Sequence, residues 1–208
     1  MYLQRTEHDA LCASHYNARP GGRNCRSNQS EGSFQDSLND WLVSIIVAVA
    51  LAFCIRTFIF EPYKVEGTSI NPTLHNQERL IVNKFSYFLG DPKRNEIIVF
   101  RYPKDESRDF IKRVIAVGGD TVEMRDGAVL VNGKKIEEPY TWKEDPKGLN
   151  HSNYRKSLVP KDHIFVLGDN RNNSEDSRFA DVDFVPLRLV KGRADVVFWP
   201  FERFRKLP

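Results

Sequence analysis

A run of about 20 apolar residues, WLVSIIVAVALAFCIRTFIF at 41–60, constrains this chain more than any other feature. Its only charged residue is Arg56. As a helix the run would extend about 30 Å, which is enough to cross the hydrocarbon core of a bilayer. Arg56 lies near the end of the run, so its stem can carry the charge to the interface, and Trp41 is typical of the other boundary. We therefore predict one transmembrane helix at 40–60 and a lipid bilayer as a partner.

Three other interpretations of this run are weaker. Arg56 is the best argument for a helix buried in a soluble core, but a core helix does not need an apolar run of this length. A cleaved signal peptide is disfavoured because the polar stretch before the run is too long for an n-region. Lipidation at Cys54 would require a small residue where bulky Phe53 stands.

The first 39 residues are rich in Ser, Asn, Gly and Arg and show no apolar period. Such a composition cannot repay the entropy of ordering, so we predict a flexible polar tail at 1–39. His8, Cys12, His15 and Cys25 lie in it at spacings that match no common zinc site. The last of the three cysteines is Cys54, so the rest of the chain must fold without an internal disulfide.

Charge and histidine patterns exclude two classes of function. The 31 basic and 28 acidic residues leave a formal net charge of only +3, too mild for a nucleic-acid-binding surface. None of the five histidines stands in an HExxH or similar arrangement, so we expect no metal and no cofactor. No G-x-S-x-G elbow is present, although a Ser/His/Asp triad through His75 or His163 stays open because such partners meet only in space.

After Glu61 the pattern is typical of β-strands. Short apolar runs at 79–82, 96–100, 129–131, 164–167 and 194–198 are separated by Gly, Pro, Asn and Asp, and the pairs Asp126-Gly127 and Asn132-Gly133 favour tight hairpins. We predict a mostly β fold with an antiparallel domain at 61–208. The polar stretch 134–160 is predicted to be a surface excursion or a small subdomain.

Three segments carry residue types suited to chemistry. In Gly67-Thr68-Ser69-Ile70-Asn71-Pro72, a serine follows a glycine and precedes a rigid turn, which can expose both its hydroxyl and its N–H. In the segment 109–120, Lys112 stands in an otherwise apolar, strand-like run and can be desolvated and so lose its proton, although a lysine facing water from an edge strand is the simpler interpretation of the run alone. The block 167–178, LGDNRNNSEDSR, packs charged groups directly after a strand and suggests an internal ion-pair network.

Together these blocks resemble the type I signal peptidases, the membrane-bound Ser/Lys proteases of protein export. The resemblance covers nearly all of 39–200 and keeps the family's order: span, Glu61-Pro62, serine box, the strand at 96–100, Lys112-Arg113, the 168–178 block and Gly192-Arg193-Ala194. Where the family often has aspartate this chain has Glu96, and where it often has methionine after the serine this chain has Ile70.

The resemblance implies a role for each matching residue. Ser69 would be the nucleophile and Lys112 the general base, with Ser174 aiming the amine, Asp176 and Arg178 bracing the site and Arg171 beside them. The oxyanion would be held by the Ser69 N–H near Gly67, where some members carry a serine hydroxyl that this chain lacks. The substrate peptide would add as a strand near 63–65 and 109–111. Shallow pockets for small residues, as in an Ala-x-Ala site, would be built by Tyr63, Val65, Ile70, Leu74, Leu80, Val99, Phe110 and Ile111.

The family also implies a single-pass protein of the cell membrane that removes signal peptides from exported pre-proteins. Its tail would be cytoplasmic and its catalytic domain at 61–208 extracytoplasmic, and we expect a monomer. A self-cleaving repressor-type Ser/Lys protease is disfavoured by the apolar span and by the absence of a helix-turn-helix pattern. An inactive scaffold is disfavoured by the intact set of site residues. Since neighbours in a strand point oppositely, a Lys112 that faces the serine requires Arg113 to face solvent or an ion-pair partner.

Overall fold

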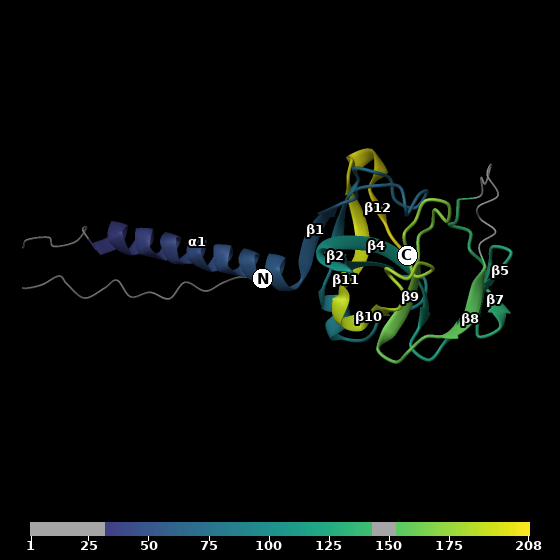
Figure 1. Cartoon of the computed structure of the whole chain (residues 1–208). Coiled ribbons are helices and arrows are strands. Elements are labelled where there is room, and N and C mark those ends of the chain that lie inside the picture. The colour runs from purple at the N-terminus through teal and green to yellow at the C-terminus, as the bar shows by residue number, and fades with distance from the viewer. Residues whose placement is uncertain (1–31, 143–152) are drawn as a thin grey trace, which may run out of the picture. The chain divides into compact units, whose positions relative to one another are not determined.

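The computed structural model describes residues 32–142 and 153–208. Residues 1–31 of the tail predicted at 1–39, with His8, Cys12, His15 and Cys25, lie outside the described residues, as does His151. Residues 32–39 belong to a helix. Figure 1 shows one long helix and a group of short strands.

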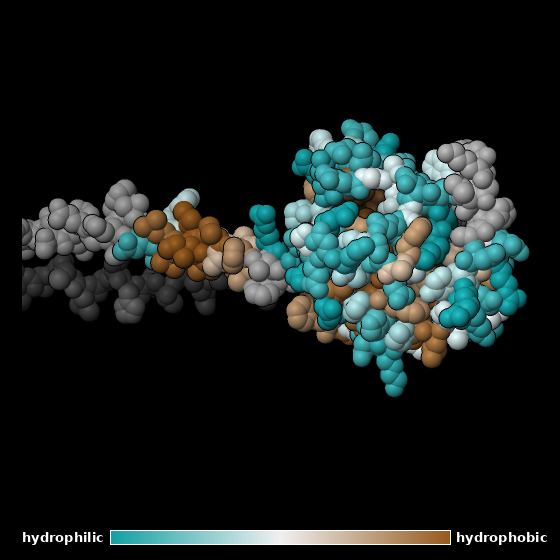
Figure 2. Space-filling view, viewed as in Figure 1, coloured by the Kyte–Doolittle hydropathy of each residue, from teal (hydrophilic) through white to brown (hydrophobic). Residues whose placement is uncertain are grey.

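Helix α1 spans Gly32–Phe58 and begins eight residues before the predicted start of the apolar run at 40. Its window Asn39–Arg56 is long and apolar enough to cross a membrane, with a mean hydropathy of 1.7 and none of the window buried inside the structure. A helix in a soluble core is mostly buried, unlike this window. Figure 2 shows hydrophobic side chains along α1, whereas the visible face of the β region is mostly hydrophilic. The helix ends at Phe58, and Phe60 already belongs to a strand, so the predicted end at 60 was two residues late.

All strand pairs are antiparallel, and most strands belong to one large sheet. Its order is β1-β2-β11-β3-β4-β9-β10, and β12 pairs with β11. The bounds are β1 Phe60–Lys64, β2 Arg79–Asn83, β3 Ile97–Tyr102, β4 Asp105–Val117, β9 His163–Leu167, β10 Val185–Pro186, β11 Val190–Trp199 and β12 Arg205–Lys206. The mostly antiparallel β prediction is confirmed.

A second, four-stranded sheet has the order β7-β6-β5-β8. Its strands are β5 Thr121–Arg125, β6 Ala128–Val131, β7 Lys134–Lys135 and β8 Tyr154–Leu158. The predicted hairpins Asp126-Gly127 and Asn132-Gly133 connect β5 to β6 and β6 to β7, with all four φ angles positive as type I′ turns require. The described parts of the stretch 134–160 therefore contribute β7 and β8 to a small sheet that starts earlier, at Thr121.

Three single-turn 3₁₀ helices complete the described elements: η1 Phe85–Phe88, η2 Leu187–Leu189 and η3 Phe201–Arg203. Apolar side chains cover both faces of β3, because Ile97 and Val99 belong to one buried cluster and Ile98 and Phe100 to another. A third cluster lies between the small sheet and β9. A strand packed on both faces holds its neighbour rigidly, and that neighbour is β4, which carries Lys112.

Candidate active site

The serine segment connects β1 to β2. Gly67 has φ 99°, a left-handed conformation that favours glycine. Ile70 and Leu74, 2% and 0% exposed, anchor the turn in the core, and the Leu74 N–H donates to the Ile70 carbonyl at 3.0 Å. Ser69 is thereby held on a turn whose two sides are fixed by burial and by backbone geometry.

Lys112 of β4 meets Ser69 directly. The Lys112 Nζ lies 2.8 Å from the Ser69 Oγ and donates to it. The lysine is only 4% exposed, which contradicts the interpretation as an edge-strand residue facing water. Burial lowers the Lys112 pKa from its ordinary 10.5 to about 8, against the attraction of Asp176 and Glu175, which raises it. A lysine with this pKa is neutral in a usable fraction of molecules near neutral pH.

Arg113, the next residue, points to a different partner. It is 1% exposed and donates to both carboxylate oxygens of Asp169, at 2.9 and 2.7 Å. Its guanidinium also donates to the Asn95 carbonyl at 2.9 Å and to the Thr73 hydroxyl at 3.3 Å. Of the two expectations for Arg113, solvent or an ion-pair partner, the structure shows the ion pair.

The loop after β9 closes over the serine segment. The Asn170 N–H donates to the Ser69 carbonyl at 3.1 Å, and the Asn170 amide donates to the Thr68 carbonyl at 3.2 Å. A Cβ at Gly168 would lie 2.5 Å from the Ser69 carbonyl oxygen, so only glycine allows this approach. The Asn173 amide adds a 2.7 Å bond to the Thr68 hydroxyl.

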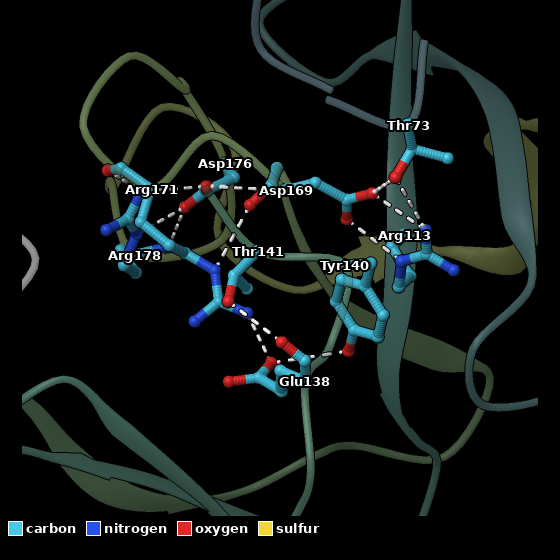
Figure 3. Close-up of polar contacts among 10 residues, drawn as sticks. Thr73, Arg113, Glu138, Tyr140, Thr141, Asp169, Arg171, Asp176 and Arg178 are labelled. Atoms are coloured by element: carbon cyan, nitrogen blue, oxygen red, sulfur yellow. Dashed lines mark hydrogen bonds and ion pairs between the residues drawn. The ribbon is translucent and has the colours of Figure 1, made fainter. Parts of the chain in front are cut away.

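Arginine–carboxylate pairs hold this loop in shape (Figure 3). Arg178 pairs with the fully buried Asp176 at 2.8 and 2.9 Å and also donates to the Arg171 carbonyl at 2.9 Å. Asp176 in turn accepts the Gly168 N–H at 3.0 Å. The internal ion-pair network predicted for 167–178 is therefore present, but it extends to residues outside that block.

Ser174 makes no hydrogen bond to the Lys112 amine, the contact that the resemblance implied. It is 8% exposed, and its hydroxyl has no hydrogen-bond partner among the described residues, Lys112 included. Its Oγ lies against Gly168, as does the Ser69 carbonyl. The hydroxyl is thus buried beside the serine segment and available to a further partner.

Four residues of the network were not assigned a role from the sequence. Asp169 and Thr73 bind each other and Arg113. Glu138 pairs with Arg171, and the Tyr140 ring lies 3.8 Å from the Arg113 guanidinium carbon. Glu138 and Tyr140 belong to the stretch interpreted as a surface excursion, which has no apolar period that could signal their burial.

A groove of about 730 Å³ opens beside Ser69 and Lys112. It lies between β1, an edge strand of the sheet, and the first half of β4, which pairs with β3 on one side but meets β9 only from Arg113 onward. Two strand edges that pair with no other described strand therefore border the groove. Of the predicted substrate-binding residues, Tyr63, Val65, Leu80, Val99, Phe110 and Ile111 line it.

Ile70 and Leu74 do not line the groove. Both lie in the buried cluster with Val65, Leu80 and Val99. They pack directly behind the groove-lining side chains of that cluster. Their role in a substrate pocket stays a prediction.

Of the two predicted oxyanion-binding residues, Ser69 has an available N–H and Gly67 does not. The Ser69 N–H has no acceptor among the described residues, so it can donate to a substrate. The Gly67 N–H donates to the Asn76 side chain at 3.1 Å, which leaves Gly67 no hydrogen to offer. Gly67 therefore contributes its open surface, since a Cβ there would contact nothing within 4 Å.

No described histidine reaches this site. The His75 N–H donates to Glu78, the His163 ring contacts the Lys161 carbonyl, and neither residue lines the groove. The described residues also contain no group of three or more His, Cys, Asp or Glu that could hold a metal. Glu96 accepts from Tyr87 and Arg193, at 3.0 and 3.2 Å, and so braces the sheet away from Ser69.

Comparison with known proteins agrees with this geometry. The family model described as "Signal peptidase, peptidase S26" matches residues 38–199. Signal peptidase I P of Bacillus subtilis subsp. natto is 41% identical over 177 residues, covering 82% of this chain and 94% of the relative. Signal peptidase I S of Bacillus subtilis strain 168 is 38% identical, covering 84% and 96%, and signal peptidase IB of Staphylococcus aureus is 37% identical, covering 81% and 93%. The chain belongs to the type I signal peptidases of peptidase family S26.

Proposed function

We propose that this signal peptidase cuts pre-proteins with Ser69 as the nucleophile and Lys112 as the general base. The observation that carries the proposal is the 2.8 Å contact between the Lys112 Nζ and the Ser69 Oγ at the wall of a groove. Burial of Lys112 favours the neutral amine that a general base requires.

Acylation forms the bond between the Ser69 oxygen and the scissile carbonyl carbon, then breaks the scissile C–N bond, and Lys112 moves one proton in each half. Neutral Lys112 takes the proton of the Ser69 hydroxyl, and the Ser69 oxygen attacks the scissile carbonyl. The Ser69 N–H donates to the oxyanion of the tetrahedral intermediate. The ammonium of Lys112 then protonates the leaving amine, which departs as the new N-terminus of the mature protein.

Deacylation uses the same base. Lys112, neutral again, takes a proton from water, and the hydroxide attacks the ester on Ser69. Collapse of the second tetrahedral intermediate returns the proton to the Ser69 oxygen and releases the signal peptide. Ser174, buried beside the serine segment with an unused hydroxyl, is a candidate to hold the amine once a substrate is bound.

The substrate is proposed to bind as an extended strand between the edges of β1 and β4. Main-chain hydrogen bonds to both edges would supply affinity, and alternate side chains would point into the groove. The apolar wall at Val65, Leu80, Val99 and Ile111 is shallow because these side chains are themselves part of the packed core or close to it. Such a wall fits small residues and supports an Ala-x-Ala preference.

The candidate membrane helix supports a single-pass arrangement. In this proposal the N-terminal tail is cytoplasmic and the β domain lies on the extracytoplasmic side, where exported pre-proteins emerge. One chain supplies Ser69, Lys112 and both edges of the groove, which supports action as a monomer.

The test is cleavage of a pre-protein with an Ala-x-Ala site by the full chain in detergent. Ser69→Ala and Lys112→Arg should each abolish cleavage while the fold is retained. Lys112→Arg is the informative change, because arginine keeps the charge but cannot give up its proton at any working pH. Substantial cleavage by Lys112→Arg would show that a different group is the base.

A further inference from the structure

The segment Glu138–Trp142, which follows β7, contacts the supports of both Ser69 and Lys112 (Figure 3). Its first contact is an ion pair between Glu138 and Arg171, whose side chains are 10% and 5% exposed. An arginine this buried needs its carboxylate, since removing one partner of a buried pair leaves an uncompensated charge. Glu138 therefore determines where Arg171 lies.

Arg171 in turn holds the loop that contacts Ser69. Its Nε donates to the Gly168 carbonyl at 3.1 Å, across the loop 168–171. The same loop holds the Ser69 carbonyl through the Asn170 N–H at 3.1 Å. Glu138 thus holds the loop 168–171 through Arg171, and that loop holds Ser69.

Tyr140 and Trp142 contact the residues that support Lys112, the proposed base. The Tyr140 ring lies 3.8 Å from the Arg113 guanidinium carbon, and Figure 3 shows the ring between Glu138 and Arg113. The Trp142 N–H donates to the carbonyl of Asp169, whose carboxylate holds Arg113. Arg113 is the strand neighbour of Lys112, so its position sets the backbone from which Lys112 reaches Ser69.

We propose that Glu138 and Tyr140 are positioning residues that hold Ser69 and Lys112 at reacting distance, Glu138 through Arg171 and Tyr140 through Arg113. The inference rests on the proposed function of Ser69 and Lys112. Neither Glu138 nor Tyr140 lines the groove, so neither touches the substrate. Their loss should therefore change the chemical step and leave binding of the substrate unaltered.

Two substitutions and one matched control test the proposal in the full chain in detergent. Glu138→Gln keeps the shape and removes the charge, and Tyr140→Leu removes the ring face from Arg113. Each should lower kcat by about ten- to a hundredfold, the loss expected when reacting groups shift by up to about 1 Å, with KM changed less than about twofold. Tyr140→Phe keeps the ring on Arg113 and removes only the long 3.3 Å hydrogen bond from the Tyr140 hydroxyl to Glu138, so it should retain kcat within about twofold.

A second control separates positioning from general loss of stability. Val129 is fully buried in the cluster of the small sheet and contacts no member of the network through a polar group. Val129→Ala should lower the Tm but leave kcat near the wild-type value. A double variant, Glu138→Gln with Arg171→Met, should lose no more kcat than Arg171→Met alone, because Glu138 acts through Arg171.

The proposal is overturned by wild-type kcat in folded Glu138→Gln and Tyr140→Leu, by a rise in KM alone, or by equal losses in Tyr140→Phe and Tyr140→Leu. If Glu138→Gln does not fold, the comparison of the two Tyr140 variants decides. Cleavage retained by Ser69→Ala would instead refute the proposed function. Wild-type kcat in the positioning variants, with Ser69→Ala inactive, would refute the positioning role alone.

Discussion

Replacing Lys112 with methionine should stabilise the protein while abolishing cleavage. Lys112 is a buried amine whose pKa falls from its ordinary 10.5 to about 8 in the folded chain, chiefly because burial penalises the ammonium. Methionine has a side chain of similar length, no charge to desolvate and enough flexibility to fill the same space. The substitution removes the penalty and leaves the packing nearly intact.

The magnitude follows from the shift in pKa. The fall in the pKa of Lys112 from 10.5 to about 8 corresponds to about 3 kcal/mol in the free energy of unfolding. Loss of the 2.8 Å contact with the Ser69 hydroxyl should offset about 1 kcal/mol of this. Near neutral pH we therefore expect Lys112→Met to be more stable than wild type by about 2 kcal/mol.

The size of the stability difference between Lys112→Met and wild type depends on pH between about pH 8 and 10.5. Below about pH 8 both folded and unfolded Lys112 carry the proton, so the whole penalty is present. Between about pH 8 and 10.5 the folded protein has released the proton while the unfolded chain still holds it, so wild-type stability rises with pH relative to the methionine variant. The advantage of Lys112→Met should be largest at pH 7 and should shrink toward pH 10.

Urea unfolding of the full chain in detergent at pH 7, 8.5 and 10 measures this difference. Other titrating groups are common to both proteins and cancel in the comparison. A methionine variant that is less stable than wild type at pH 7, or a difference that does not change with pH, would refute the argument that Lys112 is desolvated. A cleavage assay on the same samples shows whether the gain in stability at this position is accompanied by a loss of activity.

The remaining predictions concern the rate and the supports of the site. The kcat/KM for cleavage should rise with pH through an apparent pKa of about 8, and a pH series that falls over this range would contradict a lysine base. Gly168→Ala should lower both the Tm and kcat, because its Cβ would lie 2.5 Å from the Ser69 carbonyl oxygen, whereas Gly90→Ala, where a Cβ meets nothing within 4 Å, is the neutral control. Asp169→Asn should lower the free energy of unfolding by about 3–5 kcal/mol, because it leaves the charge of buried Arg113 uncompensated; a change within about 0.5 kcal/mol in urea unfolding would show that the ion pair is dispensable.

The sequence predicted local features well because each has a local physical cause. The hairpins at Asp126-Gly127 and Asn132-Gly133 follow from residues that accept positive φ, and the apolar runs that formed β2, β3, β6, β9 and β11 follow from burial. The choice of Ser69 and Lys112 depended instead on the family's order of motifs. Judged from its own strand alone, Lys112 was more simply interpreted as an edge-strand lysine facing water.

What the sequence could not supply was long-range pairing. Glu138 lies 33 positions from Arg171, and Asp169 lies 56 positions from Arg113. No period or spacing links such partners, because they meet only after the sheets have packed. The burial of Ile70 has the same origin, since the buried side of a turn residue is defined only by the core beneath it.

Charge compensation distinguishes Lys112 from the other buried cations of the site. Arg113 has Asp169, Arg171 has Glu138 and Arg178 has Asp176, each at ion-pair distance. Within the described residues, the only hydrogen-bond partner of the Lys112 amine is the Ser69 hydroxyl, and no carboxylate lies within ion-pair distance of it. The protein therefore pairs each of these arginines with a carboxylate, whereas Lys112 has none at ion-pair distance, so its burial favours the neutral amine. A substitution that frees Asp176 from Arg178 would make a carboxylate available to pair with Lys112. Such a pair should raise the pKa of Lys112 and shift the pH dependence of cleavage to more alkaline values, even with the 2.8 Å contact between Lys112 and Ser69 kept.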